Sequence, residues 1–265
     1  MDDRMTILVH DALATLFFAG PAKNKWTETE LTFAMRTELA ARNVKPDDAA
    51  LIPAAEMAHL AGTHQIVPNV AVVFPGDGPI AMRVPVRPDE VDLTSVALNG
   101  VSGTAEILAR ATLEPFYGIR TSDYLPESAE ATVSLLEGAG TLMPVEAGFQ
   151  ENLVRAWFVL TAQPVVSHVL ATPKTWSSDR TERLANAMIA LRTAGQERRA
   201  ELRLAAATEA GIDRDLLVPL FAGIRYQLDD ADRRALIMLL QHGNKGSAYP
   251  YVWTVDYFER ASVTE

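Results

Sequence analysis

The stretch Val96–Arg110, VALNGVSGTAEILAR, decides the fold class because it passes from a strand pattern to a helix pattern across one short turn. Its apolar run stops at Asn99, crosses a Ser-Gly-Thr turn at 102–104, and resumes with helical spacing at Ile107. A strand that leads directly into a helix is the repeating unit of α/β folds, whose sheets are mostly parallel. In such sheets, ligands bind beyond the carboxyl ends of the strands, where loops lead into helices.

The same turn has the chemistry of an anion site. At a helix N-terminus, free backbone N–H groups and the helix dipole favour a carboxylate or a phosphate. The hydroxyls of Ser102 and Thr104 can add two hydrogen bonds. The alternative is that one of these hydroxyls only caps the helix, as every helix requires. Both interpretations stay open, and Asn99, Ser102, Gly103 and Thr104 are predicted to bind a ligand.

Strand and helix patterns alternate along most of the chain, which extends the α/β prediction beyond this stretch. Strands are expected at residues 5–9, 49–53, 64–74, 79–86, 94–99, 131–138 and 165–173. Helices are expected at residues 26–43, 103–118 and 148–161, and over most of residues 179–242. Capping-box spacing supports two of these helix starts, at Thr27 with Glu30 and at Asp179 with Glu182.

Composition excludes several classes of protein. Hydrophobic residues make up 48% of the 265 residues, which is enough for a large core and argues against disorder. A net charge of −10 argues against general binding to nucleic acids or anionic membranes, because both require clustered Lys and Arg. The sequence contains no Cys, and no apolar run has the length of a membrane span. We therefore expect a cytoplasmic protein without disulfides.

Two other loops follow expected strands and are candidate parts of a ligand site. His10 and Asp11 follow the first strand, and a neutral histidine beside a carboxylate can act as a general acid or base. These two residues are the predicted catalytic residues, with ordinary loop polarity as the alternative because neighbours on a strand do not face each other. Gly138 and Gly140 follow another strand, where they would let the backbone approach a ligand closely or would form only a tight turn.

The sequence lacks the motifs of the common metal-dependent and cofactor-dependent enzymes. It contains no HExxH motif, no GxSxG elbow, no Walker loop and no GxGxxG fingerprint. The other histidines lack metal-ligand spacing, so no metal ion and no cofactor are expected; they are His59, His64, His168 and His242. His168 lies within an apolar run, which is typical of a core histidine.

The order of four segments resembles the menaquinone-biosynthesis family of the futalosine pathway, whose best-known members are chorismate dehydratases. Asp47–Glu56 carries an acid, an apolar run, Ile-Pro and a nearby Glu, and His64–Val73 resembles the family's I-V-P-x-V-A strand. Val96–Arg110 resembles its V-A-L-D-x-x-S-x-T-S turn, and Gly223–Leu236 resembles its closing I-x-Y-x-L helix pair. The resemblance extends from about Thr6 to Gln241.

This resemblance implies the fold of type II periplasmic binding proteins, in which two α/β lobes are joined by two crossover strands and enclose a ligand cleft. Residues 1–75 and 168–265 are expected to form one lobe, and residues 76–167 the other. The resemblance also implies a carbon–oxygen lyase that dehydrates chorismate, a small dicarboxylate, to an enolpyruvyl benzoate without a metal or an organic cofactor.

The resemblance also implies roles for the candidate residues. The Ser102, Gly103 and Thr104 turn would hold one ligand carboxylate at the helix N-terminus. From the other lobe, the ligand would be faced by His10, Asp11 and Thr15, and a third wall of the site would be shaped by Gly138 and Gly140.

Several polar positions depart from the family pattern. The family's Tyr-Leu-Asn turn after the first strand reads VHDALATLFF here, so Asp11 or Thr15 would have to replace the Asn. Ala54, Ala105 and Ala139 stand where the family usually has Ser, Ser and Asp. Each lost buried hydrogen-bond partner costs about 1–3 kcal/mol of ligand recognition. We therefore expect the fold to be retained more firmly than the reaction.

Three functions are compatible with these observations. The first is a divergent chorismate dehydratase-like lyase of menaquinone biosynthesis that acts on a small carboxylate. The second is a non-catalytic protein that binds a small anionic or polar solute. In the third, the cleft is vestigial and the aromatic tail Tyr249–Phe258 binds another protein, which could be a second copy of this chain in a homo-oligomer. None of the three involves nucleic acid or a membrane.

Overall fold

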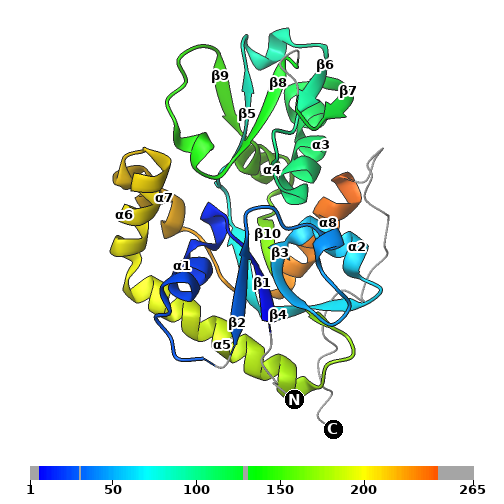
Figure 1. The fold of residues 1–265 in the computed structure, drawn as a ribbon. Helices are drawn as coiled ribbons and strands as arrows, with labels where there is room; N and C mark the ends of the chain where they lie inside the picture. Colours follow the sequence, from blue (N-terminus) through cyan, green and yellow to red (C-terminus); the bar gives the residue numbers. More distant parts are fainter. Residues whose placement is uncertain (1–5, 30, 128–130, 244–265) are drawn as a thin grey trace.

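Two five-stranded mixed sheets, each packed against helices, make up the fold (Figure 1). The structure is a computed structural model that describes residues 6–29, 31–127 and 131–243. In Figure 1 the lower sheet holds strands from both the early and the late parts of the chain, and the upper sheet holds strands from the middle. The molecule therefore has two α/β lobes, as the sequence predicts.

The first sheet is built around fully buried strands. Its strand order is β2 (Thr32–Arg36), β1 (Thr6–His10), β3 (Ala49–Pro53), β10 (Val165–Pro173) and β4 (His64–Phe74). β1 pairs in parallel with β2 and β3, whereas β10 runs antiparallel to β3 and β4. Every residue of β3 and β10 is buried, which explains why these strands read as continuous apolar runs rather than as alternating patterns.

The second sheet has the same mixture of parallel and antiparallel pairs. Its strand order is β7 (Arg120–Leu125), β6 (Leu93–Ala97), β8 (Val133–Glu137), β5 (Ile80–Val84) and β9 (Phe149–Asn152). β6 is parallel to both β7 and β8, so the loops that follow β6 and β8 leave the sheet at the same edge. β5 is antiparallel to β8 and β9. This edge contributes to the site described below.

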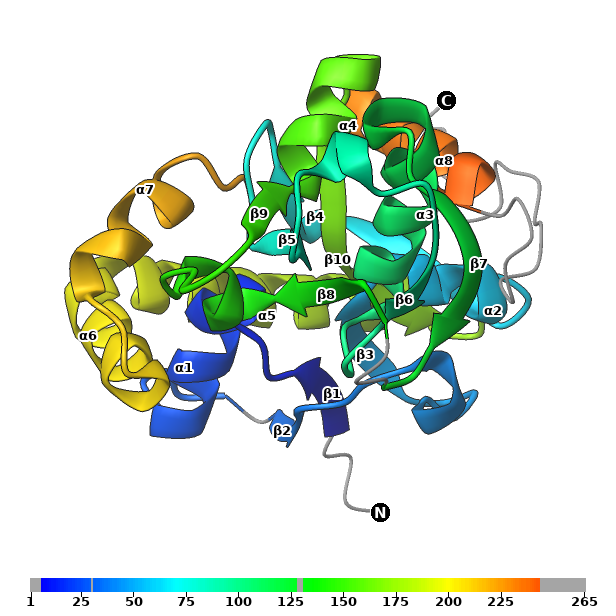
Figure 2. The same cartoon turned by 90° about the horizontal axis from the view of Figure 1, so that it is seen from above.

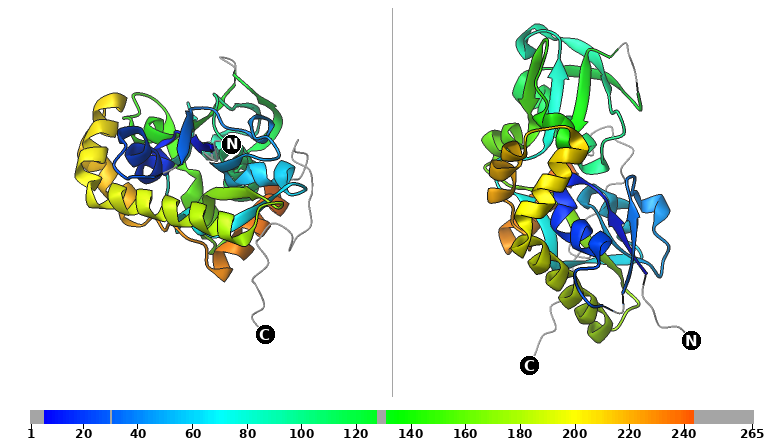
Figure 3. Two further views of the ribbon diagram at one scale, coloured as in Figure 1. Left: turned by 60° about the horizontal axis from the view of Figure 1, so that its bottom comes forward. Right: turned by 60° about the vertical axis from the view of Figure 1, so that its left-hand side comes forward.

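The helices cover the sheets and continue into the late part of the chain. Around the first sheet lie α1 (Leu16–Asn24), α2 (Met57–Leu60), α5 (Ser178–Glu197), α6 (Arg199–Ala210), α7 (Leu217–Ala222) and α8 (Asp230–Gly243). The second sheet packs against α3 (Gly103–Tyr117) and α4 (Leu153–Thr161), which lie side by side in Figure 2. The long helix α5 runs beside α1 in both views of Figure 3. Short 3-10 turns are η1 (Leu13–Thr15), η2 (Ala41–Asn43), η3 (Ala54–Glu56), η4 (Pro88–Glu90), η5 (Gly138–Leu142) and η6 (Arg214–Leu216).

Two connections join the lobes, as predicted. The chain leaves the first sheet at the end of β4 and enters the second at β5, and it returns from α4 into β10. The first connection is tied to the second lobe, because Asn152 of β9 donates from Nδ2 to Asp77 Oδ1 over 2.5 Å and Arg155 of α4 forms an ion pair with the same carboxylate. The predicted lobe limits at residues 75/76 and 167/168 stay a prediction; β10 already pairs with the first sheet at Val165.

The predicted helix at residues 26–43 is wrong, because this segment contains the edge strand β2 instead. Its apolar residues also fit a period of two: Leu31, Phe33 and Met35 pack on the larger apolar cluster, and Ala34 packs on the smaller one. Parallel pairing of β2 with β1 selects this period over the helical one. Thr27 is not in a helix, and Glu30 lies outside the described residues.

Two further predictions need smaller corrections. The helix expected at 148–161 begins only at Leu153, because Phe149–Asn152 pairs with β5 as strand β9. Asn152 caps that helix by accepting a hydrogen bond from the N–H of Arg155. The helix α5 is capped by Ser177 rather than by Asp179. The other expected strands and helices are present within a few residues, apart from the tail at Tyr249–Phe258, which lies outside the described residues.

Candidate functional site

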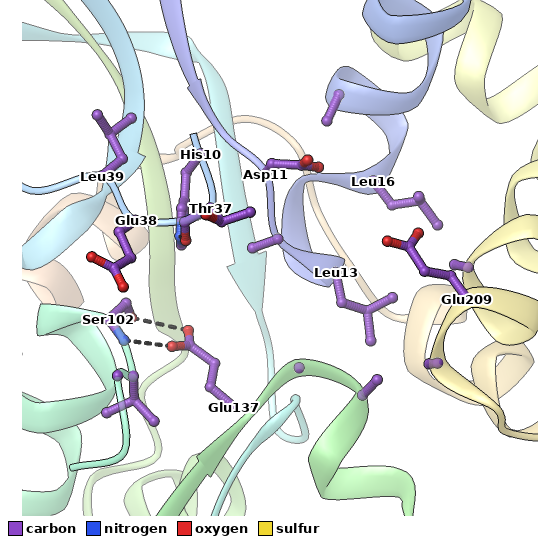
Figure 4. Close-up of a pocket in the computed structure, with 18 of the residues that line it drawn as sticks. His10, Asp11, Leu13, Leu16, Thr37, Glu38, Leu39, Ser102, Glu137 and Glu209 are labelled. Atoms are coloured by element: carbon purple, nitrogen blue, oxygen red, sulfur yellow. Dashed lines mark hydrogen bonds between the residues drawn. The ribbon is translucent and has the colours of Figure 1, made fainter. Parts of the chain in front are cut away.

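A pocket of about 830 Å³ lies between the two lobes. The first lobe lines it with the end of β1, the turn η1, the start of α1, the loop after β2, and α6. The second lobe lines it with the turn before α3 and with the junction of β8 and η5. Figure 4 shows these elements around the cavity, with Leu13 from one lobe above the η5 turn of the other. The cleft implied by the resemblance is therefore present.

The N-terminus of α3 faces this pocket and already holds a carboxylate. Glu137, the last residue of β8, accepts a hydrogen bond at Oε2 from the backbone N–H of Ser102 over 2.6 Å. Its Oε1 accepts from Ser102 Oγ over 2.9 Å. Ser102 Oγ also caps α3 by accepting from the N–H of Ala105 at 3.3 Å. The predicted anion cradle and the predicted cap are therefore the same group of atoms, and the anion is a side chain of this protein (Figure 4).

Burial and hydrogen bonding act in opposite directions on the pKa of the Glu137 carboxyl. Desolvation raises the pKa of Glu137, and the two hydrogen bonds from Ser102 lower it by a smaller amount. Removing a carboxylate from water favours its neutral form, whereas donors directed at it favour the charged form. The Ser102 turn thus offsets part of the cost of placing this carboxyl at the wall of the cleft.

The rest of the wall is rich in carboxylates. The acidic side chains that line the pocket are Asp11, Glu38, Glu56, Glu106, Glu137 and Glu209, whereas the basic ones are Lys23 and Arg42. Some of these acids have partners: Asp11 pairs with Lys23 at 2.6 Å, and Glu106 pairs with Arg110 at 2.7 Å. Among the described residues, neither Glu38 nor Glu209 has an ion-pair partner, and both are exposed. A negatively charged ligand would meet repulsion here.

His10 lies at the edge of the pocket but turns its ring nitrogens into the protein. His10 Nδ1 is 2.7 Å from His168 Nε2, His10 Nε2 is 3.1 Å from the carbonyl oxygen of Thr37, and His168 Nδ1 is 2.8 Å from Ser167 Oγ. Because the Thr37 carbonyl only accepts, His10 Nε2 carries the proton. Each neutral ring then has one donor and one acceptor, so the donors run in one direction from Ser167 through His168 and His10 to Thr37.

These hydrogen bonds between neutral histidines predict that the free energy of unfolding decreases in mild acid. Burial lowers the pKa of both His10 and His168 below the ordinary value, so the folded protein keeps both rings neutral where the unfolded chain takes up protons. Stability should be full above about pH 6.5 and fall below it, by up to about 1.4 kcal/mol per pH unit for each histidine. Urea unfolding at pH 7.5 and pH 5.5 measures this loss, and the H168F variant should show a smaller one. An equal loss in H168F would contradict the assignment.

The structure brings six of the predicted site residues to the pocket wall: His10, Asp11, Asn99, Ser102, Gly103 and Gly138. Thr15, Thr104 and Gly140 do not line it. Asn99 lies in the turn before α3 with a left-handed φ of 52°, a conformation that Asn tolerates better than most residues. Gly138 also has a positive φ of 71°, directly after Glu137.

Thr15 and Thr104 have buried hydroxyls with partners inside the protein. Thr15 Oγ1 donates to the carbonyl oxygen of His10, which closes the turn after β1. Thr104 Oγ1 accepts from the N–H of Ala55 at 3.1 Å and lies 3.2 Å from the carbonyl oxygen of Ser167, to which it donates. These bonds attach the start of α3, in one lobe, to η3 and β10 in the other. The two threonines thus position the walls of the cleft, and neither of them lines the pocket.

Sequence reasoning missed the contact that defines the site. Glu137 is separated from Ser102 by 35 positions, so spacing along the chain gives no signal for it. The signal lies in the topology: β6 and β8 are parallel neighbours, so the carboxylate that ends β8 emerges beside the helix N-terminus that follows β6. Glu38 and Glu209 were missed for a similar reason, because the loop after β2 and helix α6 reach the same pocket only through the fold.

Two classes of site are absent from the part of the chain that the structure describes. No group of three or more His, Asp or Glu side chains there has an arrangement that holds a metal ion. No described helix has the length and hydropathy needed to cross a membrane.

Comparison with protein families identifies the chain. Residues 24–245 match the family described as menaquinone biosynthesis. The chain therefore belongs to this family, in agreement with the resemblance seen in its sequence. A comparison with curated protein sequences gives no significant match.

Solved structures support the fold. Protein AF1704 from Archaeoglobus fulgidus is similar with a TM-score of 0.67 at 15% identity, covering 90% of this chain and 96% of that one. The alkanesulfonate-binding protein SsuA from Xanthomonas axonopodis pv. citri, bound to MOPS, gives 0.60 at 12% identity, with coverages of 89% and 90%. The Candida albicans CA3427 gene product, described as having the generic periplasmic binding protein fold, gives 0.59 at 12% identity, with coverages of 91% and 90%. At these identities the likeness shows the fold alone.

Proposed function

We propose that this chain is a binding protein of the menaquinone-biosynthesis family that takes a small polar molecule into the cleft between its lobes. The observation that carries the proposal is the pocket of about 830 Å³, to which both lobes contribute polar side chains. Small-molecule sites are concave, mostly apolar and equipped with a few polar groups that fix the orientation of the ligand. This pocket is concave and has apolar side chains such as Leu13, Leu16 and Leu202, but its wall carries more carboxylates than that pattern.

The arrangement of the predicted catalytic pair favours binding over acid–base catalysis. A general base must reach the proton that it abstracts. Both ring nitrogens of His10 already have partners, and the Asp11 carboxylate forms an ion pair with Lys23. The two residues therefore support the cleft wall. A cytoplasmic location and the oligomeric state stay predictions.

Filling the cleft tests this proposal. Ala139 lines the pocket, so the A139W variant should exclude the ligand, whereas L160W adds the same side chain at an exposed position of α4 outside the pocket. Native mass spectrometry of the purified proteins should find the same small molecule on the wild type and L160W, and none on A139W. A molecule retained by A139W would place the binding site elsewhere. Circular dichroism of the three proteins confirms that each is folded.

Membership in the family favours a second candidate, a chorismate dehydratase-like lyase. Its chemistry would be the elimination of water from a substrate held in a fixed geometry, which requires no cofactor. The candidate requires a substrate carboxylate to displace Glu137 from Ser102, because both compete for the same donors. Incubation with chorismate, followed by chromatography for the aromatic product, tests it. No product, together with no chorismate-induced rise in the unfolding temperature, would rule it out.

A further inference from the structure

We propose that Glu137 is a specificity-determining residue that occupies the carboxylate position of the cleft and makes it select ligands that present a hydroxyl or an amine there. The proposal rests on the cleft being the binding site. The ligand group that lies at the N-terminus of α3 is then a hydrogen-bond donor and not an acid.

Glu137 uses the donors that a ligand carboxylate would need. One carboxylate oxygen accepts from the backbone N–H of Ser102 and the other from its hydroxyl, at 2.6 and 2.9 Å. Ser102 Oγ accepts from the N–H of Ala105 through a lone pair, so its proton remains available for donation to Glu137. Hydrogen bonds to an ionised carboxylate are shorter and stronger than bonds between neutral groups. A ligand acid would have to break both bonds between Ser102 and Glu137.

The backbone holds Glu137 in this place. Residue 137 pairs with Ile80 in the antiparallel ladder of β8 and β5. The next residue, Gly138, donates its N–H to the carbonyl oxygen of Pro79 over 2.8 Å and turns the chain with a positive φ. The carboxylate therefore approaches Ser102 from a fixed strand end, and only rotation of its side chain could release the cradle.

The neighbouring acidic side chains also disfavour a ligand acid. Glu38 and Glu209 line the cavity from opposite sides in Figure 4, and the described residues provide neither with an ion-pair partner. A carboxylate has about four lone-pair sites, so Glu137 keeps acceptor capacity after its two bonds to Ser102. A ligand hydroxyl or amine can donate to that remaining capacity, whereas a ligand acid would compete with Glu137 for the same two donors within an acidic wall.

A pair of matched probes tests the inference. Benzoate and benzylamine have the same ring and differ in the group that they present, and the backbone amide of Ser102 reports locally on both by nuclear magnetic resonance. In the wild type, benzylamine should shift the Ser102 signal saturably and benzoate should not. In the E137A variant, which frees the two donors, benzoate should bind at least tenfold more tightly than to the wild type, and benzylamine more weakly.

The control is E209A, which removes the same charge from the pocket wall without freeing Ser102. If benzoate binding improves equally in E209A and E137A, overall charge sets the preference and the proposal for Glu137 is wrong. Benzoate bound at Ser102 in the wild type would also overturn it. A failure of the binding-protein proposal can be distinguished from this result. In that case A139W would keep the co-purifying molecule, with either Glu or Ala at position 137.

Discussion

The D232A variant is expected to lose about 3 kcal/mol of unfolding free energy, because the Asp232 carboxylate is fully buried and makes charge-assisted bonds. It receives two bonds from the Arg225 guanidinium, at 2.7 and 2.5 Å. It also accepts from the N–H of Asp229, whose own carboxylate accepts from the N–H of Asp232, so the pair caps the start of α8 reciprocally. Arg225 in turn exchanges backbone hydrogen bonds with Val73 of the crossover strand β4.

Urea unfolding measures this effect, with D230A as the matched control. Asp230 lies in the same first turn of α8, but its side chain is 83% exposed and its partner Arg233 is 3.7 Å away. An exposed pair of this kind contributes about 0–1 kcal/mol. Because Arg225 is partly exposed, it can be solvated after the loss of its partner, which keeps the expected cost below that of a fully buried pair. Equal stabilities of D232A and D230A would contradict the role of Asp232.

The G195A variant should also lose about 3 kcal/mol, although alanine normally stabilises a helix by about 1 kcal/mol relative to glycine. A Cβ atom at Gly195, in the last turn of α5, would lie 2.5 Å from the carbonyl oxygen and 3.0 Å from the Cα of Phe17 in α1. Both atoms belong to the backbone, so no side chain can rotate to relieve the contact. Displacement of α1 would carry with it Leu16, Gly20 and Lys23, which line the cleft.

The control for this variant is G62A. A Cβ atom at Gly62 would have no neighbour within 4 Å, and this residue does not have a positive φ. G62A should therefore be as stable as the wild type or gain about 0.4–1 kcal/mol, since alanine restricts the unfolded chain. Denaturant titrations of both variants give the comparison. An unchanged or raised stability of G195A would show that α1 and α5 are not packed as described.

Much of the architecture could be predicted from the sequence, because its central elements have strong local patterns. The apolar runs of β3 and β10 and the strand-to-helix turn before α3 are examples, and their order carried the family resemblance. Weakly patterned elements were missed. The helix α1 buries five consecutive residues and contains Pro21, so it has no polar face to reveal its period, and β2 required its partner β1.

The site was predicted in position but not in chemistry. The turn at Ser102 and the end of β1 do line one pocket, as parallel strand ends should. The sequence could not show that the anion at the α3 N-terminus belongs to the protein itself, because Glu137 reaches Ser102 only through the pairing of β6 with β8. Thr104 was equally ambiguous, since a hydroxyl that ties two lobes together and one that binds a ligand have the same spacing.

A crystal structure of the protein with its co-purified molecule is the most direct test of this account, with mass spectrometry to identify the molecule. We expect density in the cleft between the lobes, with a hydroxyl or amine of the ligand within hydrogen-bond distance of Glu137 and with the bonds from Glu137 to Ser102 intact. A ligand carboxylate on the Ser102 N–H with Glu137 turned away, or a ligand bound outside the cleft, would contradict it.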